Sequence, residues 1–318
     1  MEKNLLFNKL VCEPPRAIPE TIAAARAGDQ QACEKLCASL CWVAFSSPHA
    51  ITNVYDDVVS SWLETTIQPI VHHEKKANLD SYPSVPVPDA FFEAFWAMID
   101  DADKSYDATS ITLRSAALAT YLDPGFSPLA ELAASTHPGC TDADKRTPPA
   151  LYTIEMLSES PVNSLKNDLY RMWVDNNFDP EVLDRDAIGL NKLSPHLRYL
   201  NTRILQMHDV WHLVAGYQTS ALHEIAISAF QLAQFGHNYS SHFLAVILMM
   251  IQTRSPEGFP LIFQSIAEAW KHGRETPPMM DIEWQDIWNK SLNSIRSEYA
   301  IRPFASNVPP NLLEMAAA

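Results

Sequence analysis

Apolar side chains recur every three to four residues along most of this chain, the spacing that places them on one face of an α-helix. The pattern predicts ten helices, over residues 20–46, 51–71, 91–99, 109–122, 164–176, 195–215, 221–235, 240–252, 259–272 and 281–299. Only 8 glycines occur among the 318 residues, which leaves little material for the tight turns of a strand-rich fold. We therefore expect an all-α fold, a multi-helix bundle.

The helical pattern weakens at both ends of the chain and once in the middle. Residues 1–18 look irregular, and residues 123–150 carry the polar run TDADKRTPP with no sustained apolar period, which is typical of a linker or a long surface loop. We place a boundary near residue 150, between an N-terminal helical region of unknown role (1–150) and a C-terminal helical domain (151–303). The small, polar residues 304–318 are expected to form a flexible tail.

The net charge of −15 argues against a nucleic-acid partner and against broad electrostatic binding to an anionic membrane, since both need a basic surface. The N-terminus has no secretory or mitochondrial leader pattern. The longest apolar run, from Phe243 to Ile251, is too short to span a bilayer. A cytoplasmic protein is the simplest interpretation, with membrane association through local patches left open.

The five cysteines are odd in number, which argues against a disulfide framework. Cys33, Cys37 and Cys41 recur on one face of the helix predicted over 20–46. We expect them to be small core residues, because free cysteine is often buried. The alternative is a metal site of three thiolates, but ligands on one straight helix would spread over ~12 Å. The adjacent His72 and His73 are expected on the surface.

The strongest chemical signal is a pair of histidines followed by a glutamate. On a helix, His208 and His212 project from one face about one turn apart, a spacing at which two imidazoles can bind one metal ion. On an unbroken helix Glu224 would lie ~18 Å beyond His212. It can join them only if the chain turns back.

A turn is predicted at residues 216–220. Gly216 can take the left-handed conformation that ends a helix, and Thr219 or Ser220 can cap the next one. A helical hairpin would bring Glu224 back toward the two histidines.

Two imidazoles with one or two carboxylates form a mixed nitrogen and oxygen site for a divalent metal ion. Zinc suits this set best, and iron or manganese would also accept it. Asp209 follows His208 directly, and could bind the ion, orient a histidine, or act as a catalytic base. The alternative is that these are polar residues at a seam between two helices.

His208-Asp209-x-x-His212, eleven intervening residues and then Glu224 resemble the signature of the coenzyme Q biosynthesis protein four family. The resemblance extends over roughly residues 155–303. It includes the run Met207 to Tyr217, the run Leu222 to Ala226, and, among their neighbours, Tyr170, Phe178-Asp179-Pro180, Phe230, Gln234, Trp288, Leu292 and Arg296. One departure is His223, where the family usually has glycine, and the N-terminal half has no counterpart in the family.

The resemblance implies an all-helical fold with a metal held by His208, Asp209, His212 and Glu224. It also implies a role in ubiquinone biosynthesis, in removing the ring carboxyl of a polyprenylated hydroxybenzoate and oxidising that carbon. The family is described as an organiser of the other pathway enzymes and as a set of peripheral membrane proteins with a groove for a prenyl tail. Phe243 to Ile251 and Trp211 are groove candidates, although ordinary core packing is the favoured interpretation for them.

We therefore expect a metal-dependent enzyme of the lyase type, with Asp209 as a catalytic residue and a lipophilic aromatic molecule as substrate. Other biosynthetic enzymes, a membrane surface and a second copy of the chain remain open as partners. Competing interpretations are a non-catalytic lipid-binding or scaffold protein, and a protein of another aromatic or polyketide pathway. A His-Asp metal phosphohydrolase could add His196 and Asp281, but it leaves Glu224 unexplained.

Overall fold

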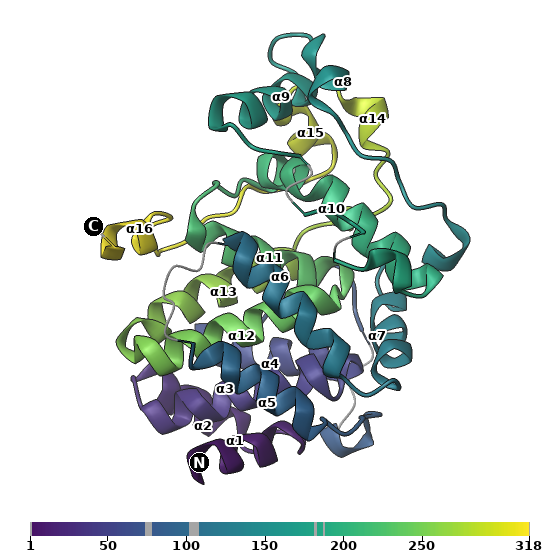
Figure 1. Cartoon of the computed structure of the whole chain (residues 1–318). Coiled ribbons are helices and arrows are strands. Elements are labelled where there is room, and N and C mark those ends of the chain that lie inside the picture. The colour runs from purple at the N-terminus through teal and green to yellow at the C-terminus, as the bar shows by residue number, and fades with distance from the viewer. Residues whose placement is uncertain (1, 74–77, 102–107, 181–182, 187, 318) are drawn as a thin grey trace.

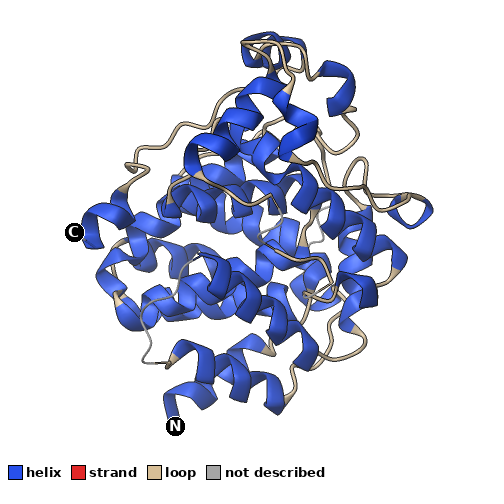
Figure 2. Cartoon of the chain, turned by 45° about the horizontal axis from the view of Figure 1, so that its top comes forward, coloured by secondary structure: helices blue, strands red, loops and turns tan. Residues whose placement is uncertain are grey.

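A computed structural model describes residues 2–73, 78–101, 108–180, 183–186 and 188–317. Every regular element in these ranges is a helix, and no strand occurs among them (Figure 2). The predicted all-α, multi-helix bundle is confirmed. In Figure 1 the first helices (purple) occupy one end of the molecule, and helices from beyond residue 150 (teal and yellow) occupy the other.

The N-terminal helices form one end of the bundle. They are α1 (Glu2–Val11), α2 (Ile18–Arg26), α3 (Gln30–Phe45), α4 (Ile51–Leu63) and α5 (Asp89–Ile99). The predicted irregular start over residues 1–18 is wrong, because α1 forms there. Phe7 and Val11, one turn apart, are buried, and the Phe7 ring lies 5.2 Å from that of Trp96. Phe7 and Trp96 are far apart in the sequence, so the local pattern of apolar residues could not predict that a helix would form and pack here.

Two predicted helices have different limits in the structure. The stretch 20–46 is divided by a turn at residues 27–29, where the carboxylate of Asp29 caps α3 by accepting the N–H of Ala32 at 2.8 Å. The stretch 51–71 is helical only to Leu63, because Glu64 adopts a left-handed conformation with φ 49°. The first error overlooked a local signal, Gly28 followed by Asp29, whereas Glu64 is not a residue type that marks a helix end.

Residues 109–122 fold largely as predicted, into α6 (Ala108–Leu118) and a short 3-10 turn. The prediction of no helix within 123–150 is wrong, because α7 (Phe126–Ser135) lies there. Apart from Phe126, the buried side chains of α7 are alanines, which bury little surface and left the apolar period hard to recognise. Whether the boundary near residue 150 separates two domains stays a prediction.

The helices predicted between residues 164 and 272 are confirmed to within about two residues at each end. They are α9 (Leu165–Asn176), α10 (Pro195–Ala215), α11 (Ala221–Phe235), α12 (Asn238–Arg254) and α13 (Phe259–Arg274), with the short α8 (Ile154–Ser158) before them.

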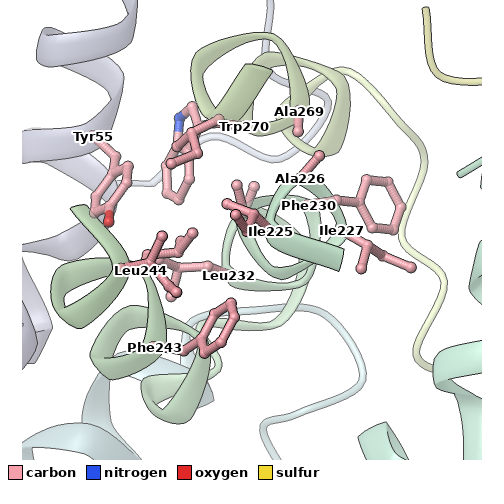
Figure 3. Packing of buried hydrophobic residues seen from close by; sticks show 14 of the residues in the cluster. Tyr55, Ile225, Ala226, Ile227, Phe230, Leu232, Phe243, Leu244, Ala269 and Trp270 are labelled. Atoms are coloured by element: carbon pink, nitrogen blue, oxygen red, sulfur yellow. The ribbon is translucent and has the colours of Figure 1, made fainter. Parts of the chain in front are cut away.

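One connected hydrophobic core takes residues from both halves of the chain. Helix α11 packs between α12 and α13, which in turn contact α3 and α4 of the N-terminal half. Figure 3 shows Tyr55 of α4 facing Trp270 of α13, and their rings stack at 4.6 Å. Burying a large apolar side chain contributes about 1.5–3 kcal/mol, so this layer fixes α11 firmly.

The buried cysteines and the apolar run belong to this core. Cys33, Cys37 and Cys41 are at most 2% exposed, which confirms their interpretation as core residues. Residues 243–250 and Trp211 are buried as well, as the favoured interpretation of ordinary packing predicted. None of the described helices combines the length and apolar character needed to cross a membrane.

The stretch 281–299 is two short helices, α14 (Trp284–Ile287) and α15 (Leu292–Glu298), and the prediction of one helix is wrong. Between them, the carbonyls of Trp288 and Lys290 accept the first backbone N–H groups of α9, at 3.0 and 2.8 Å. Because these two carbonyls accept hydrogen bonds from α9, they are not available to accept the bonds that would extend α14 into α15. Residues 304–318, predicted as a flexible tail, contain the short α16 (Leu312–Ala317). Phe304 and Val308, which precede α16, are buried.

Candidate metal centre

The predicted turn between α10 and α11 forms as a tight helical hairpin. Gly216 ends α10 with φ 81°, and the N–H groups of Gly216 and Tyr217 both donate to the carbonyl of His212, at 3.0 and 2.9 Å. A Cβ at Gly216 would lie 2.8 Å from the Cβ of Pro303, so glycine is required for space as well. Ser220 caps α11 by accepting the N–H of His223.

The hairpin brings His208, His212 and Glu224 into one group. The two Nε2 atoms are 3.0 Å apart, and the carboxylate oxygens of Glu224 lie 3.2 Å from His208 Nε2 and 3.3 Å from His212 Nε2. Each residue offers one donor atom, all within 4.8 Å of one another. Ligands held ~2.1 Å from a tetrahedral ion lie ~3.4 Å apart, so these three donors are spaced as one ion requires.

Second contacts fix which nitrogen of each ring faces the group. Nδ1 of His212 donates to the carbonyl of Tyr217 at 3.3 Å, which leaves Nε2 with a free lone pair. Nδ1 of His208 lies 2.8 Å from the side-chain amide of Gln231 on α11. If the Gln231 amide is flipped by 180°, its oxygen takes this position. The oxygen can then accept a hydrogen bond from Nδ1–H of His208, as a metal-bound imidazole requires.

The charges at the centre favour a cation. Burial alone would raise the pKa of Glu224, but its hydrogen bonds with His208 and His212 outweigh burial and hold the pKa far below its usual range. Burial alone would lower the pKa of His208, but the hydrogen bond and the charge of Glu224, with that of Asp209, raise it. A proton on His208 is therefore stabilised where a metal ion would be stabilised too.

One side of the centre faces outward. The His212 side chain is 1% exposed, whereas those of His208 and Glu224 are 29% and 30% exposed. A structural zinc site is usually closed by four protein ligands, and a catalytic site keeps an open position. Three donors with a partly exposed side fit the second pattern.

Asp209, predicted as a metal ligand and catalytic residue, stands outside the group of three. Its carboxylate accepts the indole N–H of Trp173, on α9, at 2.5 Å. The contact ties α9 to α10 beside the centre. Its predicted ligand and catalytic roles stay predictions.

His223, the departure from the family pattern, does not belong to the donor group either. Its Nδ1 accepts the backbone N–H of Gln218 at 2.8 Å, and its ring lies beside Tyr217 and Phe304. The side chain packs behind the turn and supports the hairpin. His196 and Asp281, required by the phosphohydrolase alternative, do not belong to the donor group, and Asp281 pairs with Arg146 at 2.8 Å.

Gln231 is the residue of the centre that the sequence analysis missed. It follows Glu224 by seven residues, which is two helical turns and therefore the same face of α11. That periodicity could have identified it. Gln234, part of the family resemblance, instead donates to the carbonyls of Gly273 and Thr276 and holds α11 against the end of α13.

Comparison with known proteins places this centre inside a matched segment. Residues 148–305 match the family model described as coenzyme Q (ubiquinone) biosynthesis protein Coq4. A mitochondrial ubiquinone biosynthesis protein COQ4 homolog of Drosophila ananassae is 24% identical over 147 residues, 46% of this chain and 53% of the relative. The corresponding mouse protein is 26% identical over 128 residues, 36% of this chain and 47% of the relative.

The chain thus spans about half the length of the curated relatives that it matches. A crystal structure from Nostoc punctiforme, described as that of a ubiquinone biosynthesis protein, superposes with a TM-score of 0.51 at 22% identity. The superposition covers 67% of this chain and 98% of the other. It supports the helical fold.

Proposed function

Because the C-terminal half of this chain, residues 148–305, belongs to the coenzyme Q (ubiquinone) biosynthesis protein Coq4 family, we propose a metal-dependent enzyme of ubiquinone or related biosynthesis. It acts on the carboxylated aromatic headgroup of a prenylated or otherwise lipophilic substrate. The observation that carries the proposal is the group of His208, His212 and Glu224, whose donors are spaced for one ion and which is open on one side.

In this proposal the three residues hold a divalent metal ion, zinc before iron or manganese. Such an ion supplies a Lewis acid that stabilises negative charge on a carboxylate or phenolate oxygen. The Tyr217 carbonyl keeps His212 in the tautomer that a ligand needs, and Gln231 orients the ring of His208. Asp209 is assigned a positioning role through Trp173.

The reaction breaks the bond between the ring carbon and the carboxyl group. Carbon dioxide leaves, and the electron pair remains on the ring carbon, where a proton replaces the carboxyl group in simple decarboxylation. Hydroxylation at that carbon needs dioxygen as the oxidant. Zinc has no redox chemistry, so that step requires electrons from the substrate itself or a redox-active ion.

The test is release of labelled carbon dioxide from a prenylated hydroxybenzoate carrying the label in its carboxyl group. Wild-type protein loaded with zinc, iron or manganese should release label, and Glu224→Gln should lose nearly all of this activity. Glu155→Gln is the matched control, because it makes the same change at an exposed carboxylate of α8 outside the donor group. Equal release by wild type and Glu224→Gln would refute the proposal.

A second candidate is a non-catalytic lipid-binding or scaffold protein, favoured by exposed apolar side chains at the end of the molecule that carries α8 and α9 (Figure 1). Met156 is 49% exposed, Val162 79% and Val174 45%. Such side chains suit contact with a lipid surface, a second copy or another pathway enzyme. Co-sedimentation with vesicles containing a prenylated phenol, lost on Val162→Asp, combined with metal binding but no carbon dioxide release, would support it.

A further inference from the structure

A second group of histidines surrounds a cavity of about 220 Å³ that the proposed function does not use. The cavity lies between the turn Pro48–Ala50, the start of α4, residues 72–73 and the end of α7, and it reaches Gly236 after α11. Glu224 lies near the other end of α11. Twelve residues of helix place Gly236 ~18 Å from it along the axis, so the cavity is separate from the metal centre.

His137 lines this cavity and carries an acceptor nitrogen that has no partner. Its Nδ1 lies 3.2 Å from the carbonyl of Ala133, to which it donates, and this fixes the proton on Nδ1. Nε2 then carries only a lone pair, and it is buried without a hydrogen-bond partner on a side chain that is 3% exposed. A Cβ at Gly236 would lie 2.8 Å from the ring, so glycine leaves the space that the imidazole occupies.

His73 brings a second ring to the same place from the N-terminal half. Its ring centroid lies 4.6 Å from that of His137, and its Nε2 is also buried without a partner. The prediction of a surface position therefore holds for His72, which is exposed, and only in part for His73, which is half-buried. A buried nitrogen without a partner costs free energy, so a ligand that satisfies two of them would be stabilised here.

Both rings are uncharged near neutral pH. Burial, with a contribution from the charge of His73, lowers the pKa of His137 to about 3. Burial, with the charge of Arg274, lowers that of His73 to about 4. A lone pair on a neutral ring accepts a hydrogen bond, and it repels the oxygens of a carboxylate or phosphate.

The rest of the lining mixes apolar and polar side chains, with Thr52, Asn53 and Thr136 among the polar ones. Pro48, Ile51 and Ala133 contribute apolar surface, and the ring of Tyr82 closes another side. A cavity of about 150 Å³ is enough to admit benzene, so this one has room for a ring with a small polar substituent.

We propose that this cavity binds a small uncharged molecule with a hydroxyl or amide donor on a body about the size of a benzene ring. The donor satisfies the lone pair on Nε2 of His137, and the body packs beside His73 and against Ile51 and Ala133. The site joins side chains from outside the family-matched segment, so it is a property of this chain's N-terminal half. It does not depend on the metal centre.

Three probes of similar size distinguish the contribution of the hydrogen-bond donor from those of the apolar ring and of charge. Phenol supplies a donor on a ring, toluene supplies the ring alone, and benzoate supplies a ring with charged acceptors. Binding to the full chain is measured by ligand-observed NMR titration at pH 7. We expect saturable binding of phenol, three- to tenfold weaker binding of toluene, and no binding of benzoate, because one hydrogen bond is worth about this ratio.

A cavity-filling substitution tests the location without removing a histidine. Ala133→Met should abolish phenol binding, whereas Leu132→Met, on the exposed side of α7, should leave it unchanged. Equal binding of phenol and toluene, stronger binding of benzoate, or phenol binding that survives Ala133→Met would each overturn the proposal. So would a cavity that holds only ordered water at saturating phenol in a crystal soak.

Discussion

Among the described residues, two pairs of histidine rings have the same centroid distance, 4.6 Å, but different polar neighbours. His208 and His212 share the carboxylate of Glu224, and every ring nitrogen has a polar neighbour. Among the described residues no carboxylate bridges His73 and His137, and each of these two rings has a buried Nε2 without a partner. In each pair one ring is buried, His212 at 1% exposure and His137 at 3%, and its neighbour, His208 or His73, is partly exposed.

The spacing of two histidine rings therefore does not by itself define a metal centre. The carboxylate raises the pKa of His208, so a cation is favoured beside it. Burial without a carboxylate lowers the pKa of His137 and His73, so a neutral donor is favoured there. The substitutions below change, one at a time, the carboxylate, the turn that positions it, the buried His137 ring and the contact of Asp209.

Removing the carboxylate should have the largest effect. Glu224→Gln keeps the size of the side chain but removes the charge between the two rings. Even partners outside the ligand sphere cost 10–100-fold in metal affinity, so zinc affinity should fall by about a hundredfold or more. Competition with a chromophoric chelator measures this, with Glu155→Gln, the same change at an exposed carboxylate, as control. An affinity within threefold of wild type would contradict the assignment of Glu224.

Disrupting the turn should separate Glu224 from the histidines. Gly216→Ala forces a side chain into a left-handed conformation against Pro303, which should cost about 2 kcal/mol of unfolding free energy. Zinc affinity should fall together with stability. Gly258→Ala is the control, because a Cβ there meets no atom within 4 Å. Urea unfolding of both variants checks the difference, and equal losses would refute the role of the turn.

Burial of the neutral His137 ring should make stability depend on pH. The pKa of His137 is about 3 in the folded protein and ~6.5 when unfolded, so only the unfolded state takes up its proton as pH falls below 6.5. Stability from the neutral ring is therefore complete above pH 6.5 and is lost toward pH 3, by roughly 2 kcal/mol at pH 5. His137→Gln should flatten the decline between pH 7 and 5 by that amount. Identical pH profiles would show that His137 is not buried neutral.

Asp209 should give the smallest effect. If its contact with Trp173 is its main role, Asp209→Asn and Trp173→Phe should each cost about 1 kcal/mol of unfolding free energy. Zinc affinity should change less than tenfold in both. A loss as large as that in Glu224→Gln, in Asp209→Asn alone, would make Asp209 a ligand.

Local signals made much of the fold and centre predictable. The hairpin followed from Gly216 and Ser220, whose conformations are set by neighbours in sequence. The turn before Asp29 carried signals of the same kind that were overlooked. In contrast, α1 depends on contact between Phe7 and Trp96, which no local pattern contains.

The break near Lys290 likewise depends on tertiary contact, because its carbonyl serves the N–H of Leu165. The same distinction applies to the two sites. His208, His212 and Glu224 lie within one hairpin, so spacing and a turn were enough to group them. His73 and His137 are 64 residues apart in sequence and meet only through packing. Trp173, which holds Asp209, was hidden for the same reason.

The most direct test is an anomalous difference map at the zinc absorption edge, from crystals grown with zinc. We expect one strong peak beside His208, His212 and Glu224, and no peak between His73 and His137. A peak between the second pair, or none at the first, would contradict the claim that the carboxylate selects which histidine pair holds a metal ion.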